Sequence, residues 1–104
     1  PQIWRQDPLL VYLEVYHLAR DPMGVGRFRA DFRIVPLNRE GEADTSRGPV
    51  TLGVELETQD PIFARSFFIN LRDQEPGDYR VEVEVTDLLT GETRYRQAPL
   101  EIMG

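Results

Sequence analysis

Few side chains of this sequence are of the kinds that catalysis or metal binding requires, and the first candidate is His17. It is the only histidine of the chain, and imidazole is a common general base and metal ligand near neutral pH. No serine stands in a recognisable nucleophile motif and cysteine is absent, while one histidine among scattered carboxylates is a weak metal signal. We therefore expect His17 to be a strand residue near a turn, and we predict no enzymatic activity and no cofactor.

Acidic residues gather in the loop 40–44, where Glu40, Glu42 and Asp44 could bind calcium through their oxygens. The loop lacks the regular Asp/Asn spacing of a dedicated calcium loop, and an arginine flanks it on each side, so we expect it to be solvated. Four more aspartates stand at turns, where this side chain bonds its own backbone: Asp60, Asp73, Asp78 and Asp87. The sequence leaves open whether these aspartates meet in a calcium site.

Pairs of glutamates two residues apart are the remaining candidates for acid–base chemistry. Glu55 and Glu57 form one pair, and Glu82 and Glu84 form the other. Alternate residues of a strand point to the same side, whereas glycoside hydrolysis needs two carboxyl groups that face each other across the substrate. We expect both pairs on the solvent face of strands.

Strands must carry these side chains, because hydrophobic residues recur with a period of two and no window shows a helical stripe. The alternation is cleanest from Val25 to Val35, with one apolar and one arginine-rich face, which is typical of an antiparallel sheet. Further strands are expected at 10–18, 50–56 and 63–71, with two more between Tyr79 and Ile102 and a short seventh at 3–5. Short strands between turns predict an all-β protein, an immunoglobulin-like antiparallel β-sandwich of six to seven strands.

The last two strands are expected to form a hairpin around Leu89-Thr90-Gly91, a type I turn closed by a left-handed glycine. This three-residue turn predicts four cross-strand pairs: Leu88 with Glu92, Thr86 with Arg94, Val85 with Tyr95, and Glu84 with Arg96. The register puts a valine–aromatic pair on the inner face and an opposite-charge pair on the outer face. Pro99 cannot donate to a ladder, so we expect it at a bulge or an edge.

The chain has 104 residues, no lysine, no cysteine and a formal net charge of -6. The length fits one domain, 1–104, which we expect to be a piece of a larger protein because it starts at Pro1 without a signal peptide. The acidic total argues against nucleic-acid binding, which needs clustered positive charge. The absence of cysteine excludes disulfides and cysteine-ligated zinc, and no apolar stretch approaches the roughly 20 residues of a transmembrane helix.

One surface is the best candidate for binding, formed by the polar faces of the first two long strands. It combines tyrosines with arginines, which are enriched at protein interfaces: Tyr12, Glu14 and Tyr16 on one strand, and Arg27, Arg29 and Arg33 on the next. We expect the two rows to lie side by side, either as a partner-binding surface or as a self-contained ladder in which arginine stacks on tyrosine.

The segment Pro76-Gly77-Asp78-Tyr79-Arg80-Val81-Glu82-Val83 resembles the penultimate strand of immunoglobulin- and fibronectin-type domains. By that resemblance Tyr79 is the corner tyrosine, whose hydroxyl bonds back to the preceding backbone. Val81 stands where antibody-type domains have a cysteine, which argues against a true antibody-type domain.

Two longer segments, Val11–Val35 and Pro76–Ile102, resemble the C-terminal β-sandwich region of bacterial GWxTD-domain proteins. Tyr-x-Glu-Val-Tyr-x-Leu and Gly-x-Gly-x-Phe carry the resemblance in the first segment, and Pro-Gly-x-Tyr and Thr-Asp-x-x-Thr-Gly carry it in the second. The Gly-Trp-x-Thr-Asp motif itself is absent. The resemblance covers about half of the chain and implies an extracytoplasmic protein, in the periplasm or at the cell surface, and no chemistry.

Three hypotheses follow for function. The first is a non-catalytic accessory or protein-interaction domain of an exported bacterial protein, which binds another domain of its parent chain or a protein partner and could form a homodimer through a sheet face or an edge strand. The second is a carbohydrate-binding sandwich, with an aromatic platform drawn from Trp4, Tyr12, Tyr16 and Phe68. The third is an accessory domain of an enzyme whose catalytic part lies outside this chain.

Overall fold

Seven strands and no helix make up the computed structural model, which describes every residue from Pro1 to Gly104. The strands are β1 (Gln2–Trp4), β2 (Leu9–Tyr16), β3 (Gly26–Pro36), β4 (Val50–Thr58), β5 (Ile62–Ile69), β6 (Gly77–Asp87) and β7 (Thr93–Met103). The predictions of an all-β protein and of a short first strand are confirmed.

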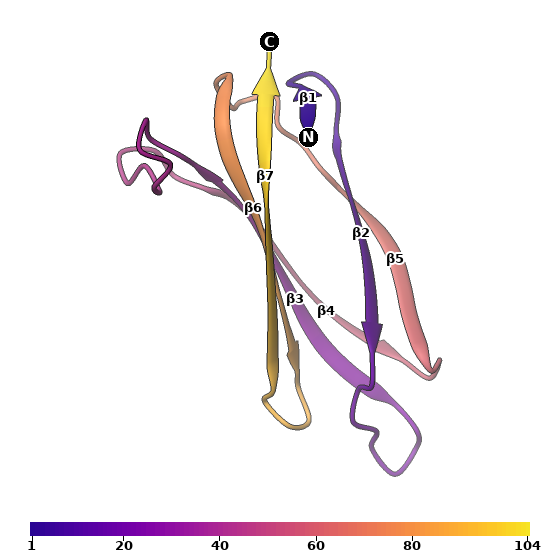
Figure 1. The fold of residues 1–104 in the computed structure, drawn as a ribbon. Helices are drawn as coiled ribbons and strands as arrows, with labels where there is room; N and C mark the ends of the chain where they lie inside the picture. The colour runs from indigo at the N-terminus through magenta and orange to yellow at the C-terminus, as the bar shows by residue number, and fades with distance from the viewer.

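The strands form two sheets that pack as a β-sandwich (Figure 1). The larger sheet has the order β1-β7-β6-β3-β4, and the smaller sheet consists of β2 and β5 alone. Neighbours are antiparallel except for β1, which runs parallel to β7. Because the chain changes sheet between β2 and β3, these two consecutive strands lie in opposite layers.

Aromatic side chains join the two layers at the core. The rings of Phe28 and Phe63 meet edge to face with centroids 4.8 Å apart, and those of Phe32 and Phe67 lie 5.0 Å apart. These pairs connect β3 with β5, at separations favourable for aromatic contact. Only 17 of the 104 residues are buried, so the core is thin and the sides of the sandwich are partly open.

The β6–β7 hairpin has a different register from the predicted one. Its loop contains four residues, Leu88 to Gly91, since the N–H of Asp87 donates to the carbonyl of Glu92 at 2.8 Å. The Asp87 carboxylate accepts hydrogen bonds from the N–H groups of Leu89 and Thr90 and so stabilises the longer turn. Every pair along the hairpin shifts by one residue, so the predicted pairing is wrong.

The shift reverses which face each β7 side chain occupies. Arg94 now lies opposite Val85, and Arg96 lies opposite Val83. Tyr95 lies opposite Glu84, on the outer face. The core-facing side of the hairpin therefore carries two arginines where a valine–aromatic pair was expected.

β7 is an edge strand at Pro99, which is one of the two predicted alternatives. It pairs with Arg80 in an unbroken ladder without a bulge. On its other side β7 is paired with β1 only from Glu101 to Met103. No strand flanks β7 at Pro99, so the missing N–H removes no ladder bond.

Tyr79 ties the turn before β6 to the core. Its side chain is 1% exposed, and its hydroxyl donates to the carbonyl of Glu75 at 2.6 Å. Arg47 lies over the ring, with its guanidinium carbon 5.8 Å from the centroid. The backbone bond is the one that the resemblance to immunoglobulin-type domains assigns to a corner tyrosine.

Candidate functional site

The two halves of the predicted binding surface lie on opposite faces of the molecule. Tyr12, Glu14 and Tyr16 project outward from β2 in the smaller sheet. Arg27, Arg29 and Arg33 project outward from β3 in the larger sheet. The prediction that they lie side by side is wrong, because alternation tells which residues share a face of a strand but not which sheet the strand joins.

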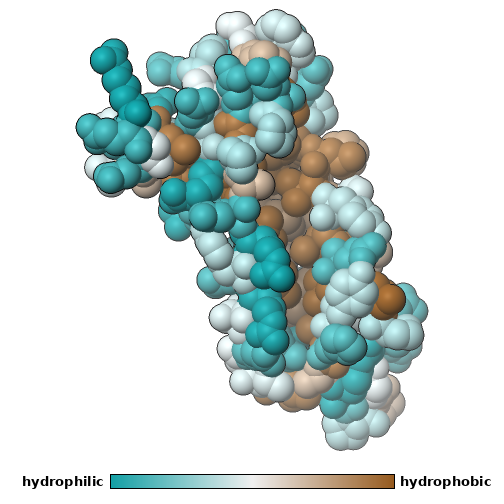
Figure 2. Space-filling model, viewed as in Figure 1, coloured by the Kyte–Doolittle hydropathy of each residue, from teal (hydrophilic) through white to brown (hydrophobic).

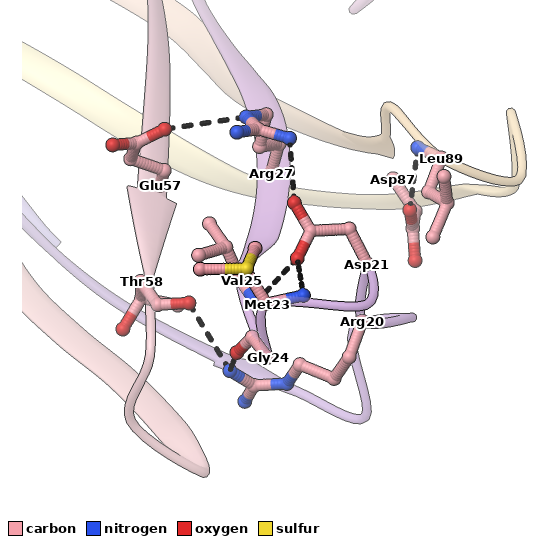
Figure 3. A network of polar contacts seen from close by, with 10 residues as sticks. All are labelled: Arg20, Asp21, Met23, Gly24, Val25, Arg27, Glu57, Thr58, Asp87 and Leu89. Atoms are coloured by element: carbon pink, nitrogen blue, oxygen red, sulfur yellow. Dashed lines mark hydrogen bonds and ion pairs between the residues drawn. The ribbon is translucent and has the colours of Figure 1, made fainter.

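Arg27 is held by acidic residues at one end of the sandwich (Figure 3). Its guanidinium lies 3.0 Å from the carboxylate of Asp21 and 3.2 Å from that of Glu57. Asp21 in turn accepts hydrogen bonds from the N–H groups of Val25 and Met23. The bond from Val25 contributes most to lowering the pKa of Asp21, and Met23 and Arg27 add to it against the opposing effect of burial. Arg27 thus ties down the β2–β3 connection.

The other two arginines of β3 also meet carboxylates. Arg29 pairs with Asp31 at 3.0 Å, and Arg33 lies 3.9 Å from Glu82. Arg29 lies across Gly53, where a Cβ atom would come within 2.2 Å of the guanidinium nitrogen. The arginine row is therefore compensated by nearby acids.

The outer face of the smaller sheet is mostly apolar. Four rungs make up this β2–β5 outer face: Leu10 with Phe68, Tyr12 with Ser66, Glu14 with Ala64, and Tyr16 with Ile62. Phe68 is 68% exposed and Tyr12 59% exposed, and the other large apolar side chains of the face are about half exposed. No third strand or loop covers them, since the sheet has only two strands.

A single carboxylate lies in the middle of the β2–β5 outer face. Glu14 accepts a hydrogen bond from the hydroxyl of Tyr12 at 2.8 Å and another from the hydroxyl of Tyr16. The bonds from Tyr16 and Tyr12 lower the pKa of Glu14, and the same bonds raise the pKa of each tyrosine. Glu14 is therefore an anion at neutral pH, held between two aromatic rings.

Sequence reasoning missed most of the β5 side of this surface: it named Phe68 as an outward residue but not Ile62, Ala64 and Ser66. The signal was present in the alternation of 62–69, because Phe63, Phe67 and Ile69 point inward. What the pattern did not show was that β5 is the strand beside β2.

The residues with acid–base or metal-binding potential stay apart. His17 is exposed, follows β2 directly and has a left-handed backbone with φ of 58°. Asp44 is engaged by Ser46 and by Arg47 at 3.0 Å, while Asp87 serves backbone N–H groups. No three histidine, aspartate or glutamate residues come together in an arrangement that could hold a metal ion.

Comparison with known proteins finds no matching family model and no match among curated proteins. The resemblance to GWxTD-domain proteins therefore stays a prediction. The chain has no helix that is long and apolar enough to span a membrane.

Proposed function

We propose that this chain is a non-catalytic, immunoglobulin-like interaction domain that binds a protein partner through the β2–β5 outer face. The observation that carries the proposal is the exposure of five large hydrophobic side chains on one side of a two-stranded sheet: Leu10, Tyr12, Tyr16, Ile62 and Phe68. Contiguous apolar surface of this kind on a folded domain marks an interaction site. The resemblance to GWxTD-domain proteins supports an exported bacterial setting, which we propose with it.

Glu14 indicates what the partner surface offers. A flat apolar partner would bury this anion without a counter-charge, which is strongly unfavourable. A partner with apolar side chains around one arginine or lysine would pair with Glu14 and cover the tyrosines. A neighbouring domain of the parent chain and a separate protein can both present this chemistry.

Site-specific crosslinking followed by titration tests the proposal. A photoreactive amino acid at Phe68 captures the partner in the native host, and the same amino acid at Thr51 samples the outer face of the larger sheet. The captured partner is then purified and titrated against the chain. We expect Phe68→Ser and Tyr12→Ala each to raise the dissociation constant about tenfold or more, as for a central aromatic contact.

Arg29→Ala is the matched control, because Arg29 is a partly exposed residue on the opposite layer. It should leave the dissociation constant unchanged. Equal crosslinking from Thr51 and Phe68, or an unchanged affinity in the Phe68 and Tyr12 variants, would overturn the assignment of this surface.

A carbohydrate ligand is the second candidate, favoured by the placement of Tyr12, Tyr16 and Phe68 on one face. Trp4 lies on β1 in the other sheet and is not part of this platform. Binding on a glycan array that Tyr12→Ala abolishes and Arg29→Ala preserves would favour this function over a protein partner.

A further inference from the structure

A groove of about 540 Å³ runs between β2 and the β6–β7 hairpin. Its apolar lining comes from both sheets, and four of these residues are only partly buried: Val11, Leu13, Val83 and Val85. Figure 2 shows a hydrophobic band running down the molecule between more polar borders. The groove exists because the smaller sheet has no strand beyond β2, on the side where the larger sheet continues to β7.

The main chain of β2 is available along this groove. β2 pairs with β5 on one side only, and none of the backbone hydrogen bonds outside the strand ladders involves Leu9–Tyr16. Half of its N–H and C=O groups therefore face the groove without a strand partner, as on any free edge.

The facing edge of β7 is occupied at two of its carbonyls. Asp87 and Glu92 form a hydrogen-bonded pair, so the alternation of an antiparallel ladder turns the carbonyls of Thr93 and Tyr95 away from β6. Guanidinium groups occupy both of these carbonyls: Arg94 donates to Thr93 at 3.2 Å, and Arg96 donates to Tyr95 at 2.9 Å. Of the two edges that flank the groove, β2 is the one whose free main-chain groups are not taken by side chains.

The two arginines at the groove differ in their charge balance. Arg94 pairs with Glu92, with a nitrogen–oxygen distance of 2.5 Å. Arg96 makes no ion pair, and its one hydrogen bond goes to a neutral carbonyl. The other acids at the groove are engaged, Asp87 by backbone N–H groups and Glu14 by the two tyrosines. Arg96 is thus the cation left to receive a carboxylate.

We propose that the β2 edge is a strand-addition site, which binds an extended segment of another protein whose groove-facing residues combine apolar side chains with one carboxylate. The segment pairs with β2 through main-chain hydrogen bonds, in the manner of peptides that add a strand to a sheet edge. Its apolar side chains cover Val83 and Val85, and its carboxylate pairs with Arg96. This site uses the main-chain edge of β2, whereas the proposed function uses the outer side chains of β2 and β5; Tyr12, Glu14 and Tyr16 border both.

A second copy of the chain does not fit the groove as an extended segment does. The β6–β7 hairpin forms one wall of the groove, so a copy that paired its own β2 with this β2 about a twofold axis would bring its own hairpin into the same space. A single strand without such a wall meets no such obstacle.

The test uses the whole chain and a synthetic peptide of about ten residues, within the usual range of strand lengths and enough to span the 8 residues of β2. The peptide carries valines and one glutamate at alternate positions with threonines between them, and a second peptide has lysine in place of the glutamate. We expect slower amide hydrogen exchange in β2 when the glutamate peptide binds, and no change along the free edge of β4. In fluorescence anisotropy Arg96→Glu should weaken binding of the glutamate peptide about tenfold and favour the lysine peptide.

Arg65→Glu is the matched control, because Arg65 also occupies a core-facing position, on β5 opposite Leu13 and outside the groove lining. It should leave both affinities unchanged. No binding of the glutamate peptide up to about 1 mM, a range that includes weak peptide complexes, overturns the proposal. Peptide binding that leaves amide hydrogen exchange in β2 unchanged also overturns it. Sedimentation that shows the wild type to be a dimer, with slower exchange in β2, overturns it as well. A variant that loses peptide binding but still binds the partner of the β2–β5 outer face shows that only this proposal fails. A variant that loses partner binding but still binds the peptide shows that only the proposed function fails.

Discussion

Arg96 lies directly opposite Val83 across the β6–β7 ladder, so a guanidinium and a valine leave the sheet on the same, core-facing side. Arg94 and Val85 repeat the arrangement two residues away. Inward-pointing charges on an edge strand are one means by which natural sheets avoid pairing with one another. Both arginines reach solvent through the open side of the sandwich, and there they occupy carbonyls of β7 that another chain could otherwise use.

Replacing Arg96 by valine should stabilise the fold and leave the free edge of β7 open to another chain. The new side chain would extend the apolar surface of Val83, and we expect a gain of about 1 kcal/mol in the free energy of unfolding from the additional buried area. Urea unfolding measures the gain, and sedimentation should show self-association. Arg39→Val, in the exposed loop before β4, should give neither effect.

Tyr79→Phe should destabilise the fold while keeping its packing. Phenylalanine retains the buried ring but loses the hydroxyl that donates to Glu75 at 2.6 Å. We expect a decrease of about 1–2 kcal/mol in the free energy of unfolding, measured by urea denaturation. Tyr95→Phe removes an exposed hydroxyl that bonds Gln97, and a comparable loss there would contradict the assignment of Tyr79 as a corner residue.

Asp87→Asn should weaken the fold at neutral pH and flatten the pH dependence of stability. Burial opposes the charge of Asp87, but N–H groups of Ala19, Leu89 and Thr90 outweigh it and lower the pKa of this carboxyl. The contribution is fully present above the unfolded-state pKa of about 3.9 and is lost as the pH falls through the lower folded-state pKa. Unfolding curves between neutral and acidic pH should show the wild type losing its advantage of about 1–2 kcal/mol over the variant. A constant difference at all pH values would contradict this role.

His17→Gly should stabilise the chain. His17 has a φ of 58°, a conformation that is unfavourable by about 1–2 kcal/mol for a residue with a Cβ atom. Glycine relieves this strain but loses more backbone entropy on folding, so we expect a net gain of about 0.5–1 kcal/mol in thermal unfolding. His17→Ala keeps the Cβ atom and should bring no gain. An equal change in thermal stability for the glycine and alanine variants would contradict the role of backbone strain at His17.

The sequence by itself determined which residues of each strand share a face. The alternation of Phe28, Ala30 and Phe32 with arginines, and of Leu10 and Tyr12 with inward residues, depends only on the period of an extended chain and is therefore a local property. The same is true of the outward position of Phe68, whereas the pattern predicts a loop one residue too short for the β6–β7 hairpin and does not decide between a bulge and an edge for Pro99. From the alternation the all-β sandwich could be predicted.

Tertiary structure alone decided which strands became neighbours. β2 pairs with β5 and not with β3, although β3 follows it in the chain, and this choice separates the tyrosines from the arginines and gathers the apolar outer face. One extra loop residue between Asp87 and Glu92 likewise turns Arg96 toward the core-facing side. Partner choice and register depend on contacts between residues far apart in the chain, where a shift of one residue inverts a face. For that reason they do not follow from the local pattern.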